Sequence, residues 1–428
     1  MSAISVRYIY SACVVIETED ARILCDPWFT EGIYDGSWFH FPKVADPLGS
    51  IGDVSHIYIS HIHPDHYDPD FLRSYFDEYG EKPLLISDLS PNFLQKKMLA
   101  DGFGPTVLAE GTTLDVGETS LQIMPHKTGS ISDIDSALIV RSRDGEGKVH
   151  CVVNANDIVF DEGARRELKE VSGEVDILLC GYTGAGPYPQ TYFDFDDPAL
   201  SIEAENKKQA FFERYRQLTE CISAKVNLPF AGKYVLGGKL SKLNFFRGVA
   251  DPVEVLRFDP NAMVLADNGG EISTLNFEPT RQRTEPYALE DIRARVEEIE
   301  SEKMDYERLI PETEIHQLPL RRLLASAYHK AVSRSEVEDD YYFVLRLNEE
   351  FVVLNANRKK KPKIDTVTRP DDLPTPRSEV DIDPRYLFGL LTHVYHWNNA
   401  EVGSQFQVRR TPNVFDRAVQ GFLNFLAV

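Results

Sequence analysis

The sequence predicts a mixed α/β protein, an α/β sandwich followed by a smaller α+β unit. Short apolar runs rich in β-branched residues alternate with helix-favouring segments, which is the pattern of strands and helices that pack in layers. The chain has 428 residues and so exceeds one ordinary hydrophobic core. A charged, helix-favouring segment at residues 286–305 marks the expected boundary. We therefore expect two domains, residues 1–285 and residues 286–428.

The first domain opens with a predicted β-hairpin. Residues 5–27 contain two apolar runs around the polar turn ETEDAR, and the second run ends at Asp26. Another strand, residues 56–60, leads into the segment SHIHPDHYD and then into a helix. Asp68 is the expected N-cap of this helix and Pro69 its first residue. The histidine-rich segment is therefore a loop between a strand and a helix.

Strands and helices then alternate along both domains. Further strands are predicted over residues 83–88, 121–125, 136–142, 148–157 and 175–181, with helices over residues 92–99 and 204–223. In the second domain we expect a helix over residues 318–332, a hairpin over residues 340–356, and a helix followed by a polar turn over residues 384–406. An α+β extension is the simplest description of this second domain.

Composition and charge exclude several classes of protein. The chain has 68 acidic and 46 basic residues, a formal net charge of -22, which argues against nucleic acid as a partner. It contains no apolar run long enough for a membrane span and no signal-peptide pattern, so we expect a cytoplasmic protein with no membrane partner. The five cysteines are scattered singly, without the pairs that zinc ribbons or Rieske iron–sulfur centres need, and we expect them to be reduced core residues.

The loop SHIHPDHYD has the residue types and spacing of a metal site. His61 and His63 are two residues apart and can point the same way, while Asp65 and His66 on the following turn can face a second point nearby. Neutral imidazoles and carboxylates suit zinc, iron or manganese. A pair of such ions about 3.5–4 Å apart can activate a water or oxygen between them. The loop therefore predicts two half-sites for transition-metal ions.

The run HIHPDH, residues 61–66, resembles the signature of the metallo-β-lactamase fold superfamily. The resemblance covers roughly residues 5–245 and implies an αββα sandwich in the first domain, with the second domain expected to cap the active site. It also implies roles for two aspartates that follow strands. Asp26 would support the metal ligands without binding a metal itself, and Asp157, in the run NANDI, would bridge the two metals.

Two metal ligands implied by the resemblance have no single counterpart in the sequence. The third ligand of the first metal is either His126 or Asp133, and Asp135 is the next candidate. Asp133 would make the ligand set harder and favour iron or manganese over zinc. A late histidine ligand is missing, because no histidine occurs between His150 and His316. His396 of the second domain is the expected substitute, with His393 next.

Several stretches outside the ligands are similar to the metallo-β-lactamase-like portion of CMP-N-acetylneuraminate hydroxylase: DPWFTEGIYDGSW, GYTGAGPYPQTY, LPFAGKYVLGG and HWNNAEVGSQF. This resemblance implies a di-iron oxygenase, and a di-iron hydroxylase of the chloramphenicol pathway gives the fold a precedent for oxygen chemistry. Because the chain lacks Rieske residues, a separate electron-donor protein would supply the reductant.

Two other functions remain open from the sequence. A hydrolase of phosphoesters, lactones or amides would use the same metals to activate a hydroxide, with Asp65 or Asp157 handling the proton. A metal-stabilised binding protein is the third possibility. For each, the ligand is expected to be a small polar or anionic molecule that contacts Tyr182 and Thr183 of a glycine-rich loop, and Lys233.

Overall fold

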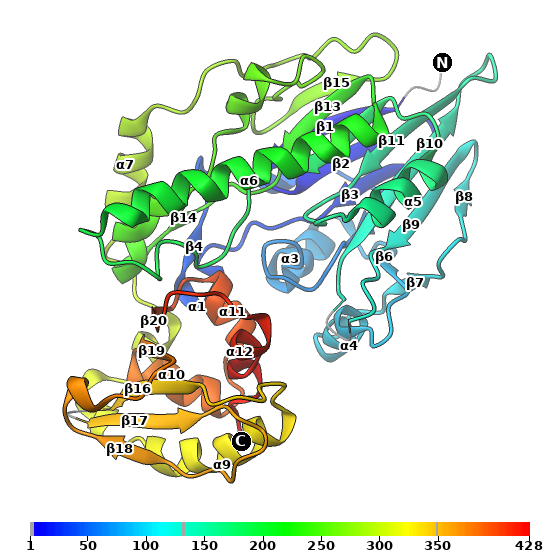
Figure 1. Ribbon diagram of the computed structural model, residues 1–428. Helices are drawn as coiled ribbons and strands as arrows, with labels where there is room; N and C mark the ends of the chain where they lie inside the picture. The colour runs from blue at the N-terminus through cyan, green and yellow to red at the C-terminus, as the bar shows by residue number, and fades with distance from the viewer. Residues whose placement is uncertain (1–3, 131–132, 348–349) are drawn as a thin grey trace.

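The computed structural model describes residues 4–130, 133–347 and 350–428, and its larger part is built on two β-sheets that lie face to face (Figure 1). The first sheet has the strand order β15-β1-β2-β3-β5-β6-β7 and the second has the order β13-β12-β11-β10-β9-β8. The first sheet contains β1 (Ser5–Tyr10), β2 (Cys13–Glu17), β3 (Arg22–Cys25), β5 (His56–Tyr58), β6 (Leu84–Ser87), β7 (Thr106–Leu108) and β15 (Gly270–Ser273). The second contains β8 (Leu114–Val116), β9 (Thr119–Pro125), β10 (Ser136–Arg143), β11 (Val149–Asn154), β12 (Ile177–Gly181) and β13 (Val226–Phe230).

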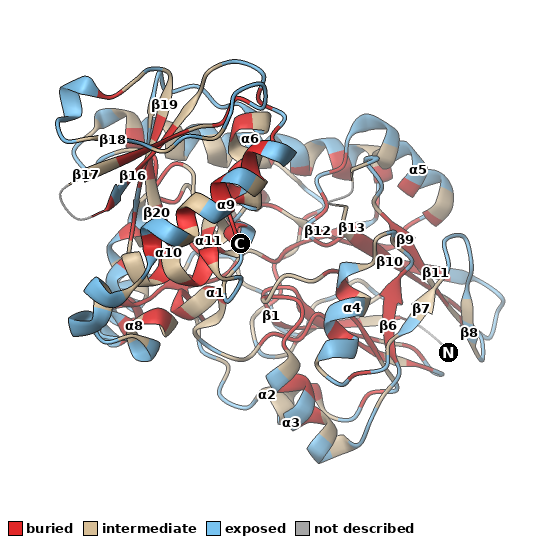
Figure 2. Ribbon diagram, turned by 90° about the horizontal axis from the view of Figure 1, so that it is seen from below, coloured by how far each residue is buried: buried red, intermediate tan, exposed pale blue. Residues whose placement is uncertain are grey.

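Helices cover the outer faces of both sheets. On the first sheet, α3 (Pro69–Tyr79) and α4 (Phe93–Ala100) bury apolar residues such as Leu72 against Ile57. On the second, α5 (Glu162–Ser172) and α6 (Pro198–Ile222) do the same, with Phe212 packed in one cluster with Leu178. Buried residues concentrate in the strands between these layers (Figure 2). The predicted αββα sandwich is therefore confirmed.

The first predicted hairpin is a three-stranded meander. The polar turn lies where it was expected, between β2 and β3, but the first apolar run divides into β1 and β2 at Ser11. Ser11 has a positive φ of 49°, and the pairing register shifts between Tyr8 and Tyr10. A local backbone reversal of this kind leaves no gap in hydrophobicity, so the two strands look like one run in the sequence.

The helix after the histidine loop begins where the sequence predicts. Asp68 is its N-cap, accepting a hydrogen bond from the backbone N–H of Phe71, and Pro69 occupies the first turn. Asp68 also accepts hydrogen bonds from the backbone N–H groups of Phe29 and Thr30. One buried carboxylate therefore fixes both the start of α3 and the loop that follows β3.

The carboxy-terminal part contains a separate sheet with the order β18-β17-β16-β19-β20. Its strands are β16 (Tyr342–Leu347), β17 (Glu350–Asn355), β18 (Asp365–Val367), β19 (Arg377–Ile382) and β20 (Phe406–Thr411). The predicted hairpin corresponds to β16 and β17, and its turn at residues 348–349 lies outside the described residues. The helices of this part are α7 (Leu289–Ile299), α8 (Asp305–Leu309), α9 (Leu320–Arg334), α10 (Pro384–Leu391), α11 (Trp397–Val402) and α12 (Arg417–Gly421).

The two parts of the molecule share a hydrophobic core. Trp38 and Tyr234 from the first part belong to the same buried cluster as Leu390, Trp397 and Phe343 from the second. A short helical segment, α1 (Ile33–Gly36), and a two-stranded sheet of β4 (Trp38–Phe39) and β14 (Val235–Leu236) lie at this junction. The remaining α-helix of the first part is α2 (Pro47–Ile51), and the short 3-10 helices are Gly238–Phe246, Pro252–Arg257, Glu312–Gln317, Pro370–Asp372 and Leu423–Phe425.

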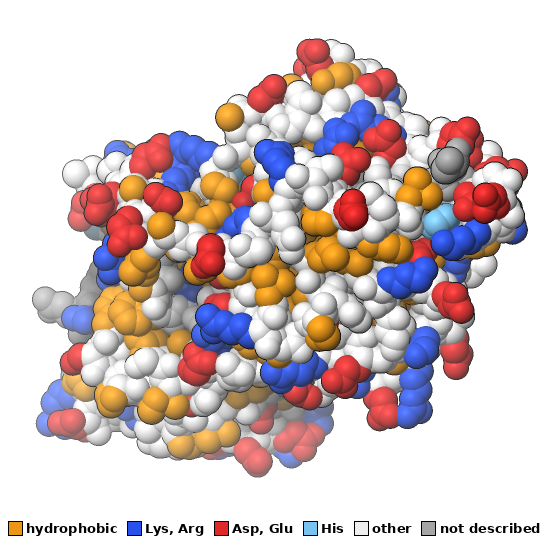
Figure 3. Space-filling model, turned by 90° about the horizontal axis from the view of Figure 1, so that it is seen from above, with side chains coloured by type: hydrophobic (Ala, Val, Ile, Leu, Met, Phe, Trp, Pro, Cys, Tyr) orange, Lys and Arg blue, Asp and Glu red, His pale blue; other side chains and the backbone are white. Residues whose placement is uncertain are grey.

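None of the helices in the described part of the chain combines the length and apolarity needed to cross a bilayer. On the face of the molecule seen in Figure 3, acidic and basic side chains are interspersed, with hydrophobic patches between them. Basic side chains therefore occur on this face even though the net charge of the whole chain is strongly negative.

Candidate metal centre

The candidate ligands converge because several strands end at one edge of the sandwich. Asp26 directly follows β3, and the histidine loop follows β5, its parallel neighbour in the first sheet. In the second sheet, Asp157 follows β11, while His126 and Asp135 flank the β9–β10 hairpin connection beside it. Ends of neighbouring strands meet at one sheet edge, so residues far apart in sequence come together there.

Two imidazoles of the loop face a common point. The Nε2 atom of His61 lies 2.9 Å from the Nδ1 atom of His63. Two metal–nitrogen bonds of about 2.1 Å, at roughly a right angle, would place their nitrogens about 3 Å apart. The opposite nitrogen of each ring is held by a neighbour: His61 Nδ1 lies 2.9 Å from the Ser60 hydroxyl, and His63 Nε2 lies 3.2 Å from Oδ1 of Asn398. This arrangement leaves one nitrogen of each ring for a metal ion.

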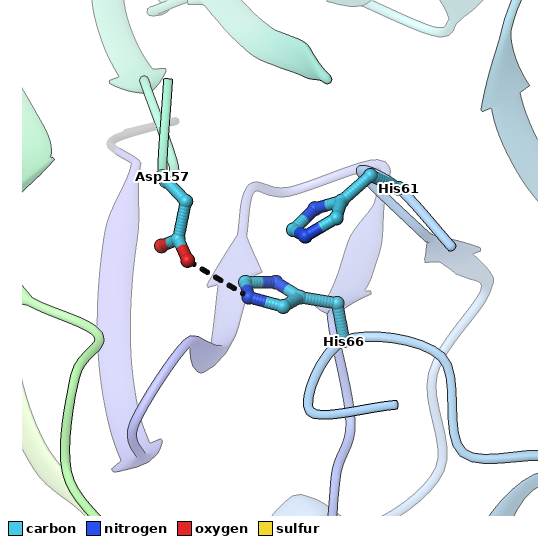
Figure 4. Close-up of side chains that lie close together, drawn as sticks. All are labelled: His61, His66 and Asp157. Carbon is cyan, nitrogen blue, oxygen red and sulfur yellow. Dashed lines mark hydrogen bonds and ion pairs between the residues drawn. The ribbon is translucent and has the colours of Figure 1, made fainter. Parts of the chain in front are cut away.

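His66 completes the group with the aspartates beside it. Its Nδ1 atom lies 3.2 Å from Oδ2 of Asp26, and its Nε2 atom lies 3.3 Å from Asp157 and 3.4 Å from Asp65. One ligand atom from each of His61, His66 and Asp157 falls within 4.8 Å of the other two. Figure 4 shows the two rings side by side, with the carboxylate opposite them. The donor set therefore fits a transition-metal site by both chemistry and spacing.

Asp26 supports this group from behind. It is fully buried, accepts a hydrogen bond from the backbone N–H of Ser60, and accepts another from the side-chain amide of Asn156. With its contact to His66, this carboxylate links the histidine loop to the turn that carries Asp157. The sequence analysis did not identify Asn156 as a site residue. Its position directly before Asp157, in the run NANDI, could have indicated this role. Its backbone has a positive φ of 54°.

The charges of the loop suit metal binding. Burial lowers the pKa of the His61 imidazole well below its ordinary value, and the nearby rings of His66 and His63 lower it further, so His61 is neutral as a ligand must be. Burial disfavours the charged form of His66, but the carboxylates of Asp65 and Asp157 outweigh burial and raise its pKa well above the ordinary value. Burial would raise the pKa of Asp65, but His66 and other neighbours lower it. A proton on His66 therefore occupies the place that a cation would take.

The three candidates for the third ligand lie in different surroundings. Asp133 accepts hydrogen bonds from the backbone N–H groups of Thr128 and Gly129, which makes it the organiser of its own turn. His126 is half-buried and donates its backbone N–H to the carbonyl of Asp135, and its ring lies 5.8 Å from that of Phe160. Asp135 lines the pocket beside the histidines, with Oδ1 3.8 Å from His61 Nδ1.

The pocket beside the loop has a volume of about 290 Å³. Its polar lining at the metal end comes from His61, His63, Asp65, Asp135 and Asp157. The glycine-rich loop after β12 lines one wall, and the remaining lining is mostly apolar but includes Arg214. Other lining residues are Tyr34, Ile158, Val159, Phe160, Thr183, Gly184, Ala185, Gly186, Phe211, Leu218 and Val402.

The residues predicted to contact substrate are divided between two cavities. Thr183 lines the pocket of the histidine loop. Tyr182 and Lys233 are buried instead around a separate cavity of about 10 Å³, where Lys233 pairs with Asp267 at 2.7 Å and donates to the Tyr287 hydroxyl at 2.8 Å. The local sequence around Lys233 could not show this, because its partners follow it by 34 and 54 residues.

Residues of the carboxy-terminal part contact the site or its supporting residues. Asn398, on α11, contacts His63 as described, while His396 is the exposed N-cap of the same helix. On the other side, the Tyr34 hydroxyl donates to Oδ1 of Asp65 at 2.5 Å, and Gln405 donates to the backbone carbonyl of Tyr34 at 2.8 Å. Sequence reasoning missed Asn398 and Tyr34, although Asn398 stands two residues after His396. His393 is exposed at the end of α10.

Comparison with known proteins agrees with this geometry. Residues 5–187 match the family model described as the beta-lactamase superfamily domain. A protein of Mycolicibacterium smegmatis named as a Rieske 2Fe-2S iron-sulfur protein is 29% identical over 271 residues, which are 59% of this chain and 47% of the relative. The cytidine monophosphate-N-acetylneuraminic acid hydroxylase of Mus musculus is 27% identical over 243 residues, 54% of this chain and 39% of the enzyme.

Solved structures include similar chains at lower identity. CmlA, a diiron beta-hydroxylase from Streptomyces venezuelae, is 14% identical, with a TM-score of 0.41 over 64% of this chain and 53% of that one. The present chain spans about half the length, or less, of the curated relatives it matches.

Proposed function

We propose that this chain is a binuclear metal-dependent enzyme of the di-iron oxygenase type. This proposal rests on the match of residues 5–187 to the β-lactamase superfamily domain. Its substrate is a small polar or anionic molecule, and its electrons come from a separate protein. The observation that carries the proposal is the set of three imidazoles whose second nitrogens are each held by a neighbour, leaving His61 Nε2, His63 Nδ1 and His66 Nε2 for metal.

The proposed ligands divide into two groups. His61, His63 and Asp135 would hold one ion, and Asp65 and His66 the other, with Asp157 between them. We propose Asp135 as the third ligand ahead of His126 and Asp133, and its support is that Asp135 lines the pocket. A carboxylate at this position makes the ligand set harder, which favours iron or manganese over zinc.

The names of the relatives also support the oxygenase hypothesis. One curated relative is named a hydroxylase and others carry Rieske in their names, which points to electron transfer as part of their chemistry. The sequence contains no Cys-x-His pair of the kind that holds a Rieske cluster, and we propose that a separate polypeptide supplies the electrons. When bound, an iron pair would supply activation of O₂, and a zinc pair activation of water.

The chain's own residues would orient the reactants and move protons. Asp65 is held by the Tyr34 hydroxyl, which fixes its carboxylate beside His66. Asp157 has a side chain that is 42% exposed, so it can exchange a proton with water or substrate. The apolar walls formed by Phe160, Leu218 and Val402 would exclude bulk water from the reacting group.

Hydrolysis is the second candidate, and the exposure of Asp157 favours it. An accessible carboxylate next to a metal pair suits the proton transfer that accompanies attack of water on a phosphoester, lactone or amide. The two functions require different metals and different co-substrates.

Metal analysis separates these functions. The full chain would be expressed in ⁵⁷Fe-supplemented medium, purified without added metal, and examined by elemental analysis and Mössbauer spectroscopy. Two coupled irons per chain would support the oxygenase. Two zincs, or one, with no O₂ consumption in the presence of a reductant, would reject the oxygenase in favour of hydrolysis.

A further inference from the structure

One cationic side chain lines the pocket without an acidic partner. Arg214 lies on the exposed side of α6, and no carboxylate within the described ranges pairs with it. Its neighbour two residues on, Arg216, is paired with Glu213 at 3.3 Å. In a chain of net charge -22, an arginine left unpaired at a pocket that also holds three aspartates is available to an anionic ligand.

The arginine is held in place by a stack of close contacts. Its Cζ atom lies 4.7 Å from the centre of the Phe211 ring, which is one turn earlier on α6. That ring presses on Gly184 so closely that a Cβ atom there would lie 1.8 Å from Phe211 Cζ. Glycine at position 184 therefore permits the glycine loop, Phe211 and Arg214 to pack against one another along the pocket wall.

The same wall offers free backbone donors. In the structure as described, the N–H groups of Gly184, Ala185 and Gly186 donate to no protein acceptor. Gly186 has a positive φ of 99°, the conformation that lets successive N–H groups form an anion-binding nest. Three unpaired donors beside an unpaired guanidinium are the elements of an anion site.

The same pocket has a largely apolar lining. Ile158, Val159 and Phe160 line it immediately after Asp157, and Leu218 and Val402 also line it. A ligand that fills the pocket from Arg214 to the histidines therefore contacts hydrophobic side chains. A polyhydroxylated body would lose hydrogen bonds to water along this surface.

We propose that Arg214 and the N–H groups of residues 184–186 bind the terminal carboxylate or phosphate of an amphipathic substrate. Its apolar segment lies along Phe160, Phe211 and Leu218, and its reacting carbon faces the aspartates and histidines at the other end. This assignment rests on the proposed function only in placing the reacting end. It defines the substrate class as an anion with an apolar body.

Matched ligand pairs test this assignment. Binding of phenylalkyl carboxylates from 3-phenylpropionate to 6-phenylhexanoate, of their neutral amides and of the corresponding phenylalkyl phosphates would be measured by calorimetry on the metal-loaded full chain. We expect one of the two anion series to bind more tightly than the amides, and the better series identifies the anionic group. If neither does so, the proposal is rejected.

Variants on one helix separate the arginine from other anion contacts. Arg214→Gln should weaken binding of the preferred anion about 10-fold or more and leave the amide unchanged, while Arg214→Lys should lose less. Arg216→Gln is the matched control and should change neither, since that arginine packs on Phe258 and pairs with Glu213. Unchanged anion binding in Arg214→Gln would overturn the assignment of the anion to Arg214. Because the assay needs no turnover, its result is independent of whether the enzyme is an oxygenase.

Discussion

The Nε2 atom of His63 lies 3.2 Å from Oδ1 of Asn398, so a residue of the carboxy-terminal part contacts the histidine loop across 335 positions of sequence. An amide oxygen at this distance can accept the Nε2–H of the ring, and the Nδ1 atom lies on the side that faces His61. The second part of the molecule thereby fixes the orientation of a proposed metal ligand that the first part supplies.

Removing this contact should weaken metal binding. We expect Asn398→Ala to raise the metal dissociation constant about 10-fold. Residues that hold a metal ligand in place usually change metal affinity by about 10- to 100-fold, and we expect the smaller effect because Asn398 is exposed. Competitive titration with a chromophoric chelator measures this constant. Asn399→Ala is the control, because the side chain of Asn399 has no hydrogen bond among the described residues. Equal affinities for all three proteins would show that Asn398 does not support the ligand.

Removing two proposed ligands should abolish metal binding. His61→Ala combined with His63→Ala takes away both nitrogens that face the common point, and a site that loses two ligands loses most of its binding free energy. Elemental analysis of the purified protein measures the outcome. The control combines His316→Ala with His329→Ala, which removes two exposed imidazoles far from the loop in sequence. A His61/His63 variant that kept two metals per chain would overturn the proposed centre.

The sequence predicts the framework of the site because that framework depends on local patterns. An apolar strand, a polar loop and an Asp-Pro helix start occur within a few residues of one another around His61, and each has its own signal. The alternation of strands and helices predicts a mixed α/β sandwich, and the family resemblance of the run HIHPDH makes it an αββα sandwich. The expected domain boundary at residue 285 stays a prediction, although a hydrophobic core continuous between the two parts limits how independent they can be.

The rest of the site depends on contacts between distant segments. The sequence does not distinguish the surroundings of Asp133 from those of Asp135: the carboxylate of Asp133 accepts hydrogen bonds from N–H groups of its own turn, whereas Asp135 lines the pocket. A turn of this kind can be recognised only once its backbone is known. The sequence makes Lys233 a candidate for substrate contact, and in the structure it is buried against Asp267, a partner that no local pattern identifies.

Asp26 should matter for stability as well as for metal binding. Its replacement by Ala leaves the N–H of Ser60 and the amide of Asn156 without their acceptor in a buried site. Each buried donor left unpaired costs about 1–3 kcal/mol, so we expect Asp26→Ala to lower the free energy of unfolding by about 3 kcal/mol or more. Urea denaturation of the metal-free protein measures this. The control variant is Asp70→Ala, because Asp70 is exposed and forms an ion pair with Arg73. Its free energy of unfolding should fall by less than about 1 kcal/mol.

Stability should also depend on pH through Glu401 of α11. Burial raises the pKa of its carboxyl to about 7, against an ordinary value of 4.5, although Gln420 and Arg410 favour the charged form. The folded state thus holds a proton that the unfolded state releases, and this contribution to stability is present below pH 4.5 and lost as the pH rises through 7. The shift corresponds to a loss of up to about 3 kcal/mol between those limits.

Glu401→Gln should remove this part of the pH dependence, because the amide stays neutral at every pH. We therefore expect the difference in unfolding free energy between the variant and the wild type to grow in the variant's favour from pH 5 to pH 8, as measured by urea denaturation. Glu297→Gln on α7 is the control for removing an exposed carboxylate and should show no such trend. Parallel pH profiles for the wild type and Glu401→Gln would mean that Glu401 titrates alike in the folded and unfolded chain.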